Sequence, residues 1–104
     1  MAEIKEIQSK IRDFAKLRKW EKFHTPKNLA MAVAGEAGEL SAEFQWLTPD
    51  EAYSVSGKQL DDIQMEIADV AIYLLRLCDV LNVDLKEAIE KKLSINESRF
   101  PEIR

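Results

Sequence analysis

Apolar residues recur every three or four positions along most of the chain, a spacing that predicts amphipathic helices. The first apolar face covers about residues 3–19. Thr25-Pro26 is typical of a helix start, so a second helix is expected from there to about Leu47. Residues 48–57 break the periodicity, and they predict only a short extra helix around residues 50–53.

Two further helices are predicted in the second half of the chain, over about residues 58–81 and 85–100. A tight connection separates them, and Asp84 with Glu87 three residues later resembles a capping box. No segment alternates apolar and polar residues in the manner of a strand. The pattern therefore predicts an all-α protein, most simply an antiparallel four-helix bundle.

The second and third predicted helices also carry apolar residues outside their principal faces. Examples are Met31, Ala34, Ile72 and Leu75. A bundle needs only one apolar face on each helix, so this surplus predicts a homo-oligomer. We expect either a homodimer or a tetramer built as a dimer of dimers.

Length and composition indicate one folded domain over residues 1–104, with 46% hydrophobic and 33% charged residues and few glycines or prolines. No segment approaches the ~20 apolar residues of a membrane span, and the N-terminus lacks the apolar stretch of a signal peptide. We therefore expect a cytoplasmic protein without a membrane partner. The single cysteine, Cys78, excludes a cysteine metal cluster within one chain.

The net charge of −4 argues against a general binder of nucleic acid polymers. The charge is unevenly distributed, since residues 29–70 hold nine acids and one base, Lys58, whereas residues 1–28 are basic. This polarity suits an anionic ligand that arrives with its own cations. Basic and acidic faces of neighbouring subunits meeting each other is the alternative, and the two interpretations are compatible.

Two acidic motifs, Glu36-Ala-Gly-Glu39 and Glu66-Ile-Ala-Asp69, lie in the second and third predicted helices. Their spacing alone is weak support, because acids are common in this chain. Helical phase is more informative: it places Glu36 within the apolar stripe of its helix and Glu66 and Asp69 along the edge of the other. Buried carboxylates need a compensating cation, and oxygen ligands suit Mg²⁺. A solvated acidic helix edge is the alternative.

Other side chains suggest contacts to a nucleotide. By angle, Lys92, Asn96 and Arg99 continue the inner stripe of the last helix, where they would suit phosphate oxygens, unless that helix end is simply solvated. Trp20 and Trp46 flank the acidic helix and could stack a base, although packing in a core or an interface is their alternative.

Several classes of chemistry lack their residues. Neither acidic motif ends in a histidine, which disfavours a di-iron bundle. The chain has no Walker-type glycine loop and no plausible Ser/His/Asp arrangement. An activated water is therefore the expected nucleophile.

Five segments together resemble the MazG-type nucleoside triphosphate pyrophosphohydrolases, and most of all their short dCTP pyrophosphatase branch. They span nearly the whole chain in the family's order: Trp20–Leu29, Gly35–Leu40, Phe44–Trp46, Glu66–Tyr73 and Lys92–Asn96. The resemblance implies Mg²⁺-dependent hydrolysis of a nucleoside triphosphate, dCTP or modified dCTP, to the monophosphate and pyrophosphate, as in sanitation of the nucleotide pool. It also implies a dimer or tetramer.

The resemblance also implies roles for individual residues. Glu36, Glu39, Glu66 and Asp69 would hold the metal, and either Glu36 or Glu39 would orient or deprotonate the water. Substrate binding would involve Trp20, His24, Trp46, Tyr73, Lys92 and Asn96, with contributions from a neighbouring subunit. Two other functions stay open: a non-catalytic helical oligomerisation module, and a nucleotide sensor without turnover.

Overall fold

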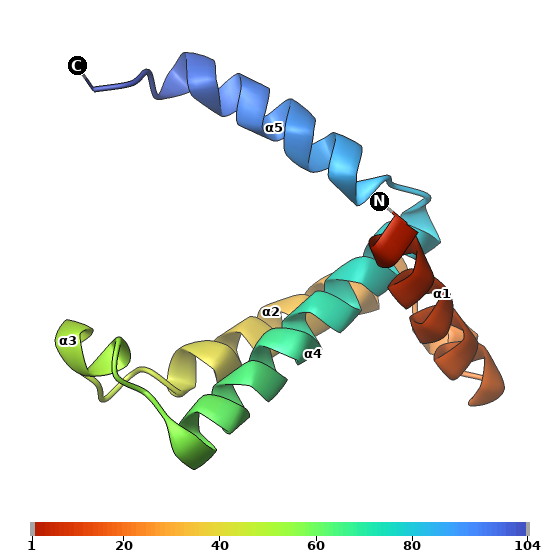
Figure 1. The fold of residues 1–104 in the computed structure, drawn as a ribbon. Helices are drawn as coiled ribbons and strands as arrows, with labels where there is room; N and C mark the ends of the chain where they lie inside the picture. The colour runs from red at the N-terminus through yellow and green to blue at the C-terminus, as the bar shows by residue number, and fades with distance from the viewer. Residues whose placement is uncertain (1, 104) are drawn as a thin grey trace.

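The computed structural model describes residues 2–103. Met1 and Arg104, the two ends of the predicted domain, lie outside the described residues. Within that range the secondary structure is entirely helical, which confirms the predicted all-α class (Figure 1). The elements in chain order are α1 (Ala2–Leu17), the 3-10 helix η1 (Glu21–Phe23), α2 (Pro26–Ala42), α3 (Pro49–Ala52), α4 (Gly57–Leu81) and α5 (Leu85–Arg99).

The starts of the helices follow from local sequence. The Thr25 hydroxyl accepts a hydrogen bond from the Asn28 N–H at 3.2 Å, with proline in the first turn as predicted. The Asp84 carboxylate likewise accepts from the Glu87 N–H at 3.0 Å. At the end of α4 the chain reverses through Asn82, whose φ of 57° is left-handed.

The second helix is shorter than predicted. It ends at Ala42, and the next N–H groups bond to carbonyls three residues back, from Glu43 to Leu40 at 3.2 Å and from Phe44 to Ser41 at 3.0 Å. The prediction of a regular helix to Leu47 was therefore wrong for its last turn. Proline disfavours the helical conformation in the residue that precedes it. Thr48, which precedes Pro49, is accordingly extended and forms the N-cap of the predicted short helix, α3.

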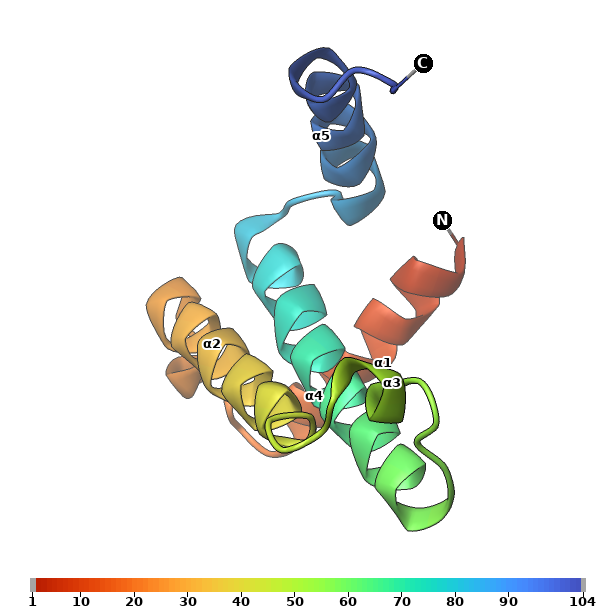
Figure 2. The ribbon, with the colours of Figure 1, turned by 90° about the vertical axis from the view of Figure 1, so that its left-hand side faces the viewer.

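α2 and α4 lie side by side and antiparallel, and they form the most extensive contact between helices (Figure 1). α1 crosses the C-terminal half of α4, and α5 leads away from the other helices (Figures 1 and 2). The antiparallel arrangement thus holds for α2 and α4, but the single chain does not form the predicted four-helix bundle. The reason is that α4 is the only helix of residues 2–103 that both α1 and α2 contact extensively, and α5 packs extensively against none of them.

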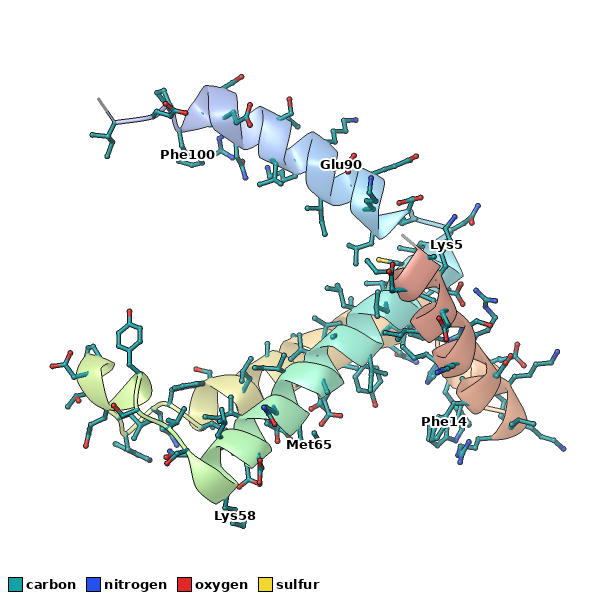
Figure 3. All side chains as sticks on the ribbon, viewed as in Figure 1. Lys5, Phe14, Lys58, Met65, Glu90 and Phe100 are labelled. Carbon is teal, nitrogen blue, oxygen red and sulfur yellow. The ribbon has the colours of Figure 1, made fainter. Side chains whose placement is uncertain are left out.

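The core is correspondingly small. Its most buried apolar side chains come from three helices: Ala15 of α1, Leu29 of α2, and Ile63 and Cys78 of α4. Three large apolar residues of α4 are exposed, because no helix within residues 2–103 covers that side: Ile67, Leu74 and Leu81. Side chains along the outer surfaces of α4 and α5 project into open space in Figure 3. None of the helices over residues 2–103 has the length and apolarity needed to cross a lipid bilayer.

Candidate metal and nucleotide site

Three carboxylates from the two predicted motifs converge between α2 and α4. One oxygen atom each of Glu36, Glu39 and Glu66 lies within 4.8 Å of the others. Because α2 and α4 are antiparallel, the middle of one helix faces the middle of the other, and this brings together residues 30 positions apart in the chain. Asp69 lies one turn beyond Glu66 but outside this group of three.

Two of these carboxylates each have one oxygen without a partner. Oε2 of Glu36 and Oε2 of Glu66 are buried, and neither forms a hydrogen bond within residues 2–103. Lys58, the one base within residues 29–70, binds Asp62 at 2.9 Å. Across residues 2–103, none of the salt bridges reaches Glu36, Glu39 or Glu66. Within the described residues, therefore, no Lys or Arg side chain forms an ion pair with this cluster.

The pKa values of two of these glutamates agree with carboxylates that lack a cationic partner. Burial raises the pKa of Glu36 above its ordinary value, and the charge of Glu39 raises it further. Burial is also the main cause of the raised pKa of Glu66, followed by the charge of Glu39. Each shift means that the folded protein resists placing negative charge here. A hard divalent cation with oxygen ligands would reverse that penalty, so the donor set fits Mg²⁺.

A pocket of about 260 Å³ lies between α1, α4 and the segment before α2. It contains the predicted metal ligand Asp69 together with three predicted substrate-binding residues, Trp20, His24 and Tyr73. The Trp20 and His24 rings lie 6.1 Å apart, centroid to centroid, and are tilted by 58°. The structure thus brings one carboxylate and several aromatic side chains together in one cavity.

Sequence reasoning missed a charged network at the back of this pocket. Arg76 is 7% exposed and donates from Nη1 to Asp79 at 3.0 Å and from Nε to Nδ1 of His24 at 3.1 Å. Arg12 of α1 donates to both oxygens of Asp79, at 2.6 and 2.8 Å. The sequence held a signal for it, since Arg76 interrupts the run Leu74-Leu75-Arg76-Leu77-Cys78 with Asp79 three residues later.

Three predicted substrate-binding residues are not brought to the pocket within one chain. Trp46 is 87% exposed and follows the C-terminal end of α2, whereas Trp20 precedes its start. A helix of that length separates the two tryptophans by roughly 25 Å along its axis. Lys92 and Asn96 lie on α5, which leads away from α2 and α4 (Figure 1). Within residues 2–103 of one chain, the two tryptophans therefore do not share a base pocket, and α5 does not face inward.

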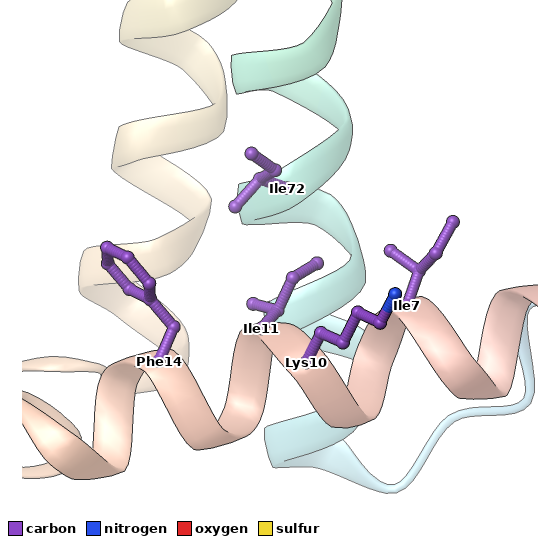
Figure 4. Close-up of a pocket in the computed structure, with 5 residues that line it drawn as sticks. All are labelled: Ile7, Lys10, Ile11, Phe14 and Ile72. Atoms are coloured by element: carbon purple, nitrogen blue, oxygen red, sulfur yellow. The ribbon is translucent and has the colours of Figure 1, made fainter.

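An apolar groove of about 330 Å³ lies between α1 and α4. Figure 4 shows Phe14, Ile11 and Ile7 of α1 and Ile72 of α4 lining it, with the Lys10 chain along its rim. Ile7, Phe14 and Ile72 are each two-fifths to one-half exposed. Such a surface is typical of an interface with another chain.

Comparison with known proteins places the chain in a family. Residues 32–104, which include both acidic motifs and α5, match the MazG-like family. This chain belongs to the MazG-like family. Human dCTP pyrophosphatase 1 is 40% identical over 100 residues, covering 94% of this MazG-like chain and 59% of the human protein. The mouse dCTP pyrophosphatase 1 is 38% identical over the same shares. The chain thus spans about three fifths of the length of these curated relatives.

A solved structure has a similar fold as well as a similar sequence. The crystal structure of a pyrophosphatase from Archaeoglobus fulgidus matches this MazG-like chain with a TM-score of 0.90 and 40% sequence identity. The match covers 96% of this chain and 94% of the archaeal one. Because so much of both chains is included, the open arrangement of helices is a property shared with that protein.

Proposed function

We propose that this protein hydrolyses nucleoside triphosphates, with dCTP or modified dCTP as the preferred substrates, to the monophosphate and pyrophosphate. The observation that carries the proposal is the cluster of Glu36, Glu39 and Glu66, which contains two buried unpartnered oxygens. One turn beyond Glu66, Asp69 lines a pocket with aromatic walls. The named activities of the human, mouse and archaeal relatives support the same reaction.

The acidic residues would hold Mg²⁺ and prepare the attacking water. Glu36, Glu39 and Glu66 are the proposed metal ligands, and Asp69, which lines the pocket, is the proposed fourth. When bound, Mg²⁺ supplies a Lewis acid for phosphate oxygens and lowers the pKa of a bound water. Either Glu36 or Glu39 orients that water or accepts its proton during attack on the α-phosphorus. Carboxylates suit that role because they accept hydrogen bonds and protons.

The aromatic pocket would receive the nucleoside. Trp20 offers a ring face for stacking, and Tyr73 and His24 offer polar atoms along the wall. Since Asp69 lies in the same pocket, the base and sugar would occupy the aromatic part and the phosphates would extend towards the carboxylates.

The remaining substrate contacts would come from another copy of the chain. Trp46, Lys92 and Asn96 are the residues that one chain leaves apart from the pocket, and α5 leaves Ile89 and Leu93 about half exposed. A homodimer or tetramer would cover these apolar faces. It would also bring a second tryptophan to the base and cationic and amide donors to the triphosphate, so the site is complete only in the oligomer.

The test measures pyrophosphate release from a panel of canonical and modified triphosphates, with and without Mg²⁺. We expect Mg²⁺-dependent release, highest with cytosine deoxynucleotides, and its loss in Glu39→Gln and Asp69→Asn. Both variants keep side-chain size, and circular dichroism verifies their folding. Asp62→Asn is the matched control, because Asp62 pairs with Lys58 outside the cluster. Unchanged turnover in both site variants would refute the metal site.

The same panel separates the two other functions. A nucleotide sensor would show thermal stabilisation by nucleotide without release of pyrophosphate. A purely structural oligomerisation module would show neither that stabilisation nor any response to Mg²⁺.

A further inference from the structure

The network behind the pocket fixes the chemistry of His24, the one histidine in the chain. Arg76 has no acceptor atom on its guanidinium, so in the 3.1 Å contact its Nε–H donates and Nδ1 of His24 accepts. A histidine that accepts at Nδ1 is neutral and carries its proton on Nε2. Among residues 2–103 the structure shows no hydrogen-bond partner for Nε2. That N–H is therefore left for a ligand.

Arg76 is itself held in place, which makes the contact a rigid one. Its side chain is 8% exposed and forms an ion pair with Asp79 at 3.0 Å. Asp79 is in turn bound by both donors of Arg12, so α1 supports the carboxylate from the opposite side. Burial and the charge of Arg76 both lower the pKa of His24, in agreement with a neutral ring.

His24 lines the same pocket as Trp20, Tyr73 and Asp69. Aromatic and aliphatic side chains make up most of its wall, and such walls bind a base by shape without reading its polar edges. A fixed N–H donor among them adds polar selectivity at little entropic cost, because the ring is already oriented.

We propose that Arg76 is a positioning residue that holds His24 as the neutral Nε2–H tautomer, so that Nε2–H donates to an oxygen acceptor on the nucleoside part of the substrate. This inference rests on the proposed function for the identity of the substrate. The tautomer itself does not, since it follows from the contacts within the chain.

Nitrogen-15 NMR of the single histidine tests the tautomer directly. In the free wild-type protein, long-range ¹H–¹⁵N spectra should show a protonated Nε2 and an unprotonated Nδ1. Arg76→Met should produce a mixture of tautomers, and Arg76→Lys should do the same while preserving the ion pair with Asp79. Arg12→Met is the matched control: it removes the other cationic partner of Asp79, and Arg12 contacts neither His24 nor the pocket. Because Arg76 keeps its ion pair with Asp79 and its contact to His24 in that variant, the wild-type tautomer should persist. A protonated Nδ1 in the wild type would overturn the proposal.

Binding without turnover tests the contact to the nucleoside. Titration with dCTP in Mg²⁺-free buffer should shift the Nε2–H resonance, whereas inorganic triphosphate should leave it in place. A shift with both ligands, or with neither, would overturn the proposal. If dCTP moves the resonance but no pyrophosphate is released with Mg²⁺, the proposed hydrolysis fails and this inference stands. If pyrophosphate is released but the His24 resonance does not move, the proposed hydrolysis stands and this inference fails.

Kinetics then test whether Arg76 acts through His24. Loss of one substrate hydrogen bond corresponds to a KM increase of about tenfold, with kcat almost unchanged if the bond is equally strong in the ground and transition states. Arg76→Met should show that increase in the wild-type background and no further increase in the His24→Ala background. Equal increases in both backgrounds would show that Arg76 supports the fold in general, and would refute the positioning role.

Discussion

Replacement of Asp79 by asparagine is the sharpest test of the network, because the change preserves shape and removes one charge. In the wild type this carboxylate accepts from Arg76 at 3.0 Å and from both donors of Arg12 at 2.6 and 2.8 Å. Arg76 would keep its positive charge in a site where its side chain is 8% exposed. The structure gives it no other acidic partner within salt-bridge distance among residues 2–103.

The expected cost follows from the burial of each partner. Removing one member of a fully buried ion pair costs about 3–5 kcal/mol. The lower end applies here, since Asp79 is 16% exposed and asparagine still offers one acceptor oxygen. The Arg12 side chain is about half exposed, so its pair with Asp79 adds no more than about 0.5 kcal/mol. We therefore expect the free energy of unfolding to fall by about 3 kcal/mol.

The assay is urea unfolding at pH 7, followed by far-UV circular dichroism at one fixed protein concentration. With a slope of about 2 kcal/mol per M urea, the midpoint should fall by about 1.5 M. Asp62→Asn on the same helix is the control, because its partner Lys58 is exposed, and it should change stability by less than about 0.5 kcal/mol. A loss below about 1 kcal/mol in Asp79→Asn would refute the assigned role of the buried pair.

The dependence on pH gives a second readout. The hydrogen bond from Arg12 is the largest cause of the lowered pKa of Asp79. A lowered folded-state pKa contributes stability that is fully present above the unfolded pKa, about 3.9, and disappears as pH falls towards the folded value. The stability difference between wild type and Asp79→Asn should therefore be constant at neutral pH and shrink below about pH 4. A difference that stays the same in acid would mean that packing, not charge, is responsible.

Four further outcomes are expected. Glu36→Gln should raise the melting temperature in metal-free buffer, because it removes the charge of a carboxylate that has a buried oxygen without a partner. The same variant should abolish the rise in melting temperature that Mg²⁺ produces in the wild type, and differential scanning calorimetry measures both effects. Leu29→Ala should cost about 2–5 kcal/mol in urea unfolding, since Leu29 is 1% exposed. Trp46→Ala should preserve the circular dichroism spectrum yet weaken dCTP binding about tenfold or more by calorimetric titration, as loss of a stacked base predicts. Ile89→Glu should shift the sedimentation coefficient towards that of a monomer, and an unchanged coefficient would remove α5 from the interface.

Local sequence was sufficient for the helices and for the identity of the acidic residues. The caps at Thr25 and Asp84 depend on neighbours three residues away, so they could be predicted directly from the sequence. Helical phase also indicated correctly that Glu36 and Glu66 are partly buried. The last turn of α2 was mispredicted because its apolar pattern continues past Ala42 while the backbone tightens before Pro49.

The sequence by itself therefore determined an all-helical chain with two acidic motifs and surplus apolar faces, because each of these depends on spacing within one helix. Only the tertiary structure decided which carboxylates meet, which residues share the pocket, and that α5 leads away from the other helices of its chain. The link from Arg12 through Asp79 and Arg76 to His24 joins residues 52 and 67 positions apart. Contacts of that range depend on how helices cross, and the crossing is decided by packing between helices, which no local pattern contains.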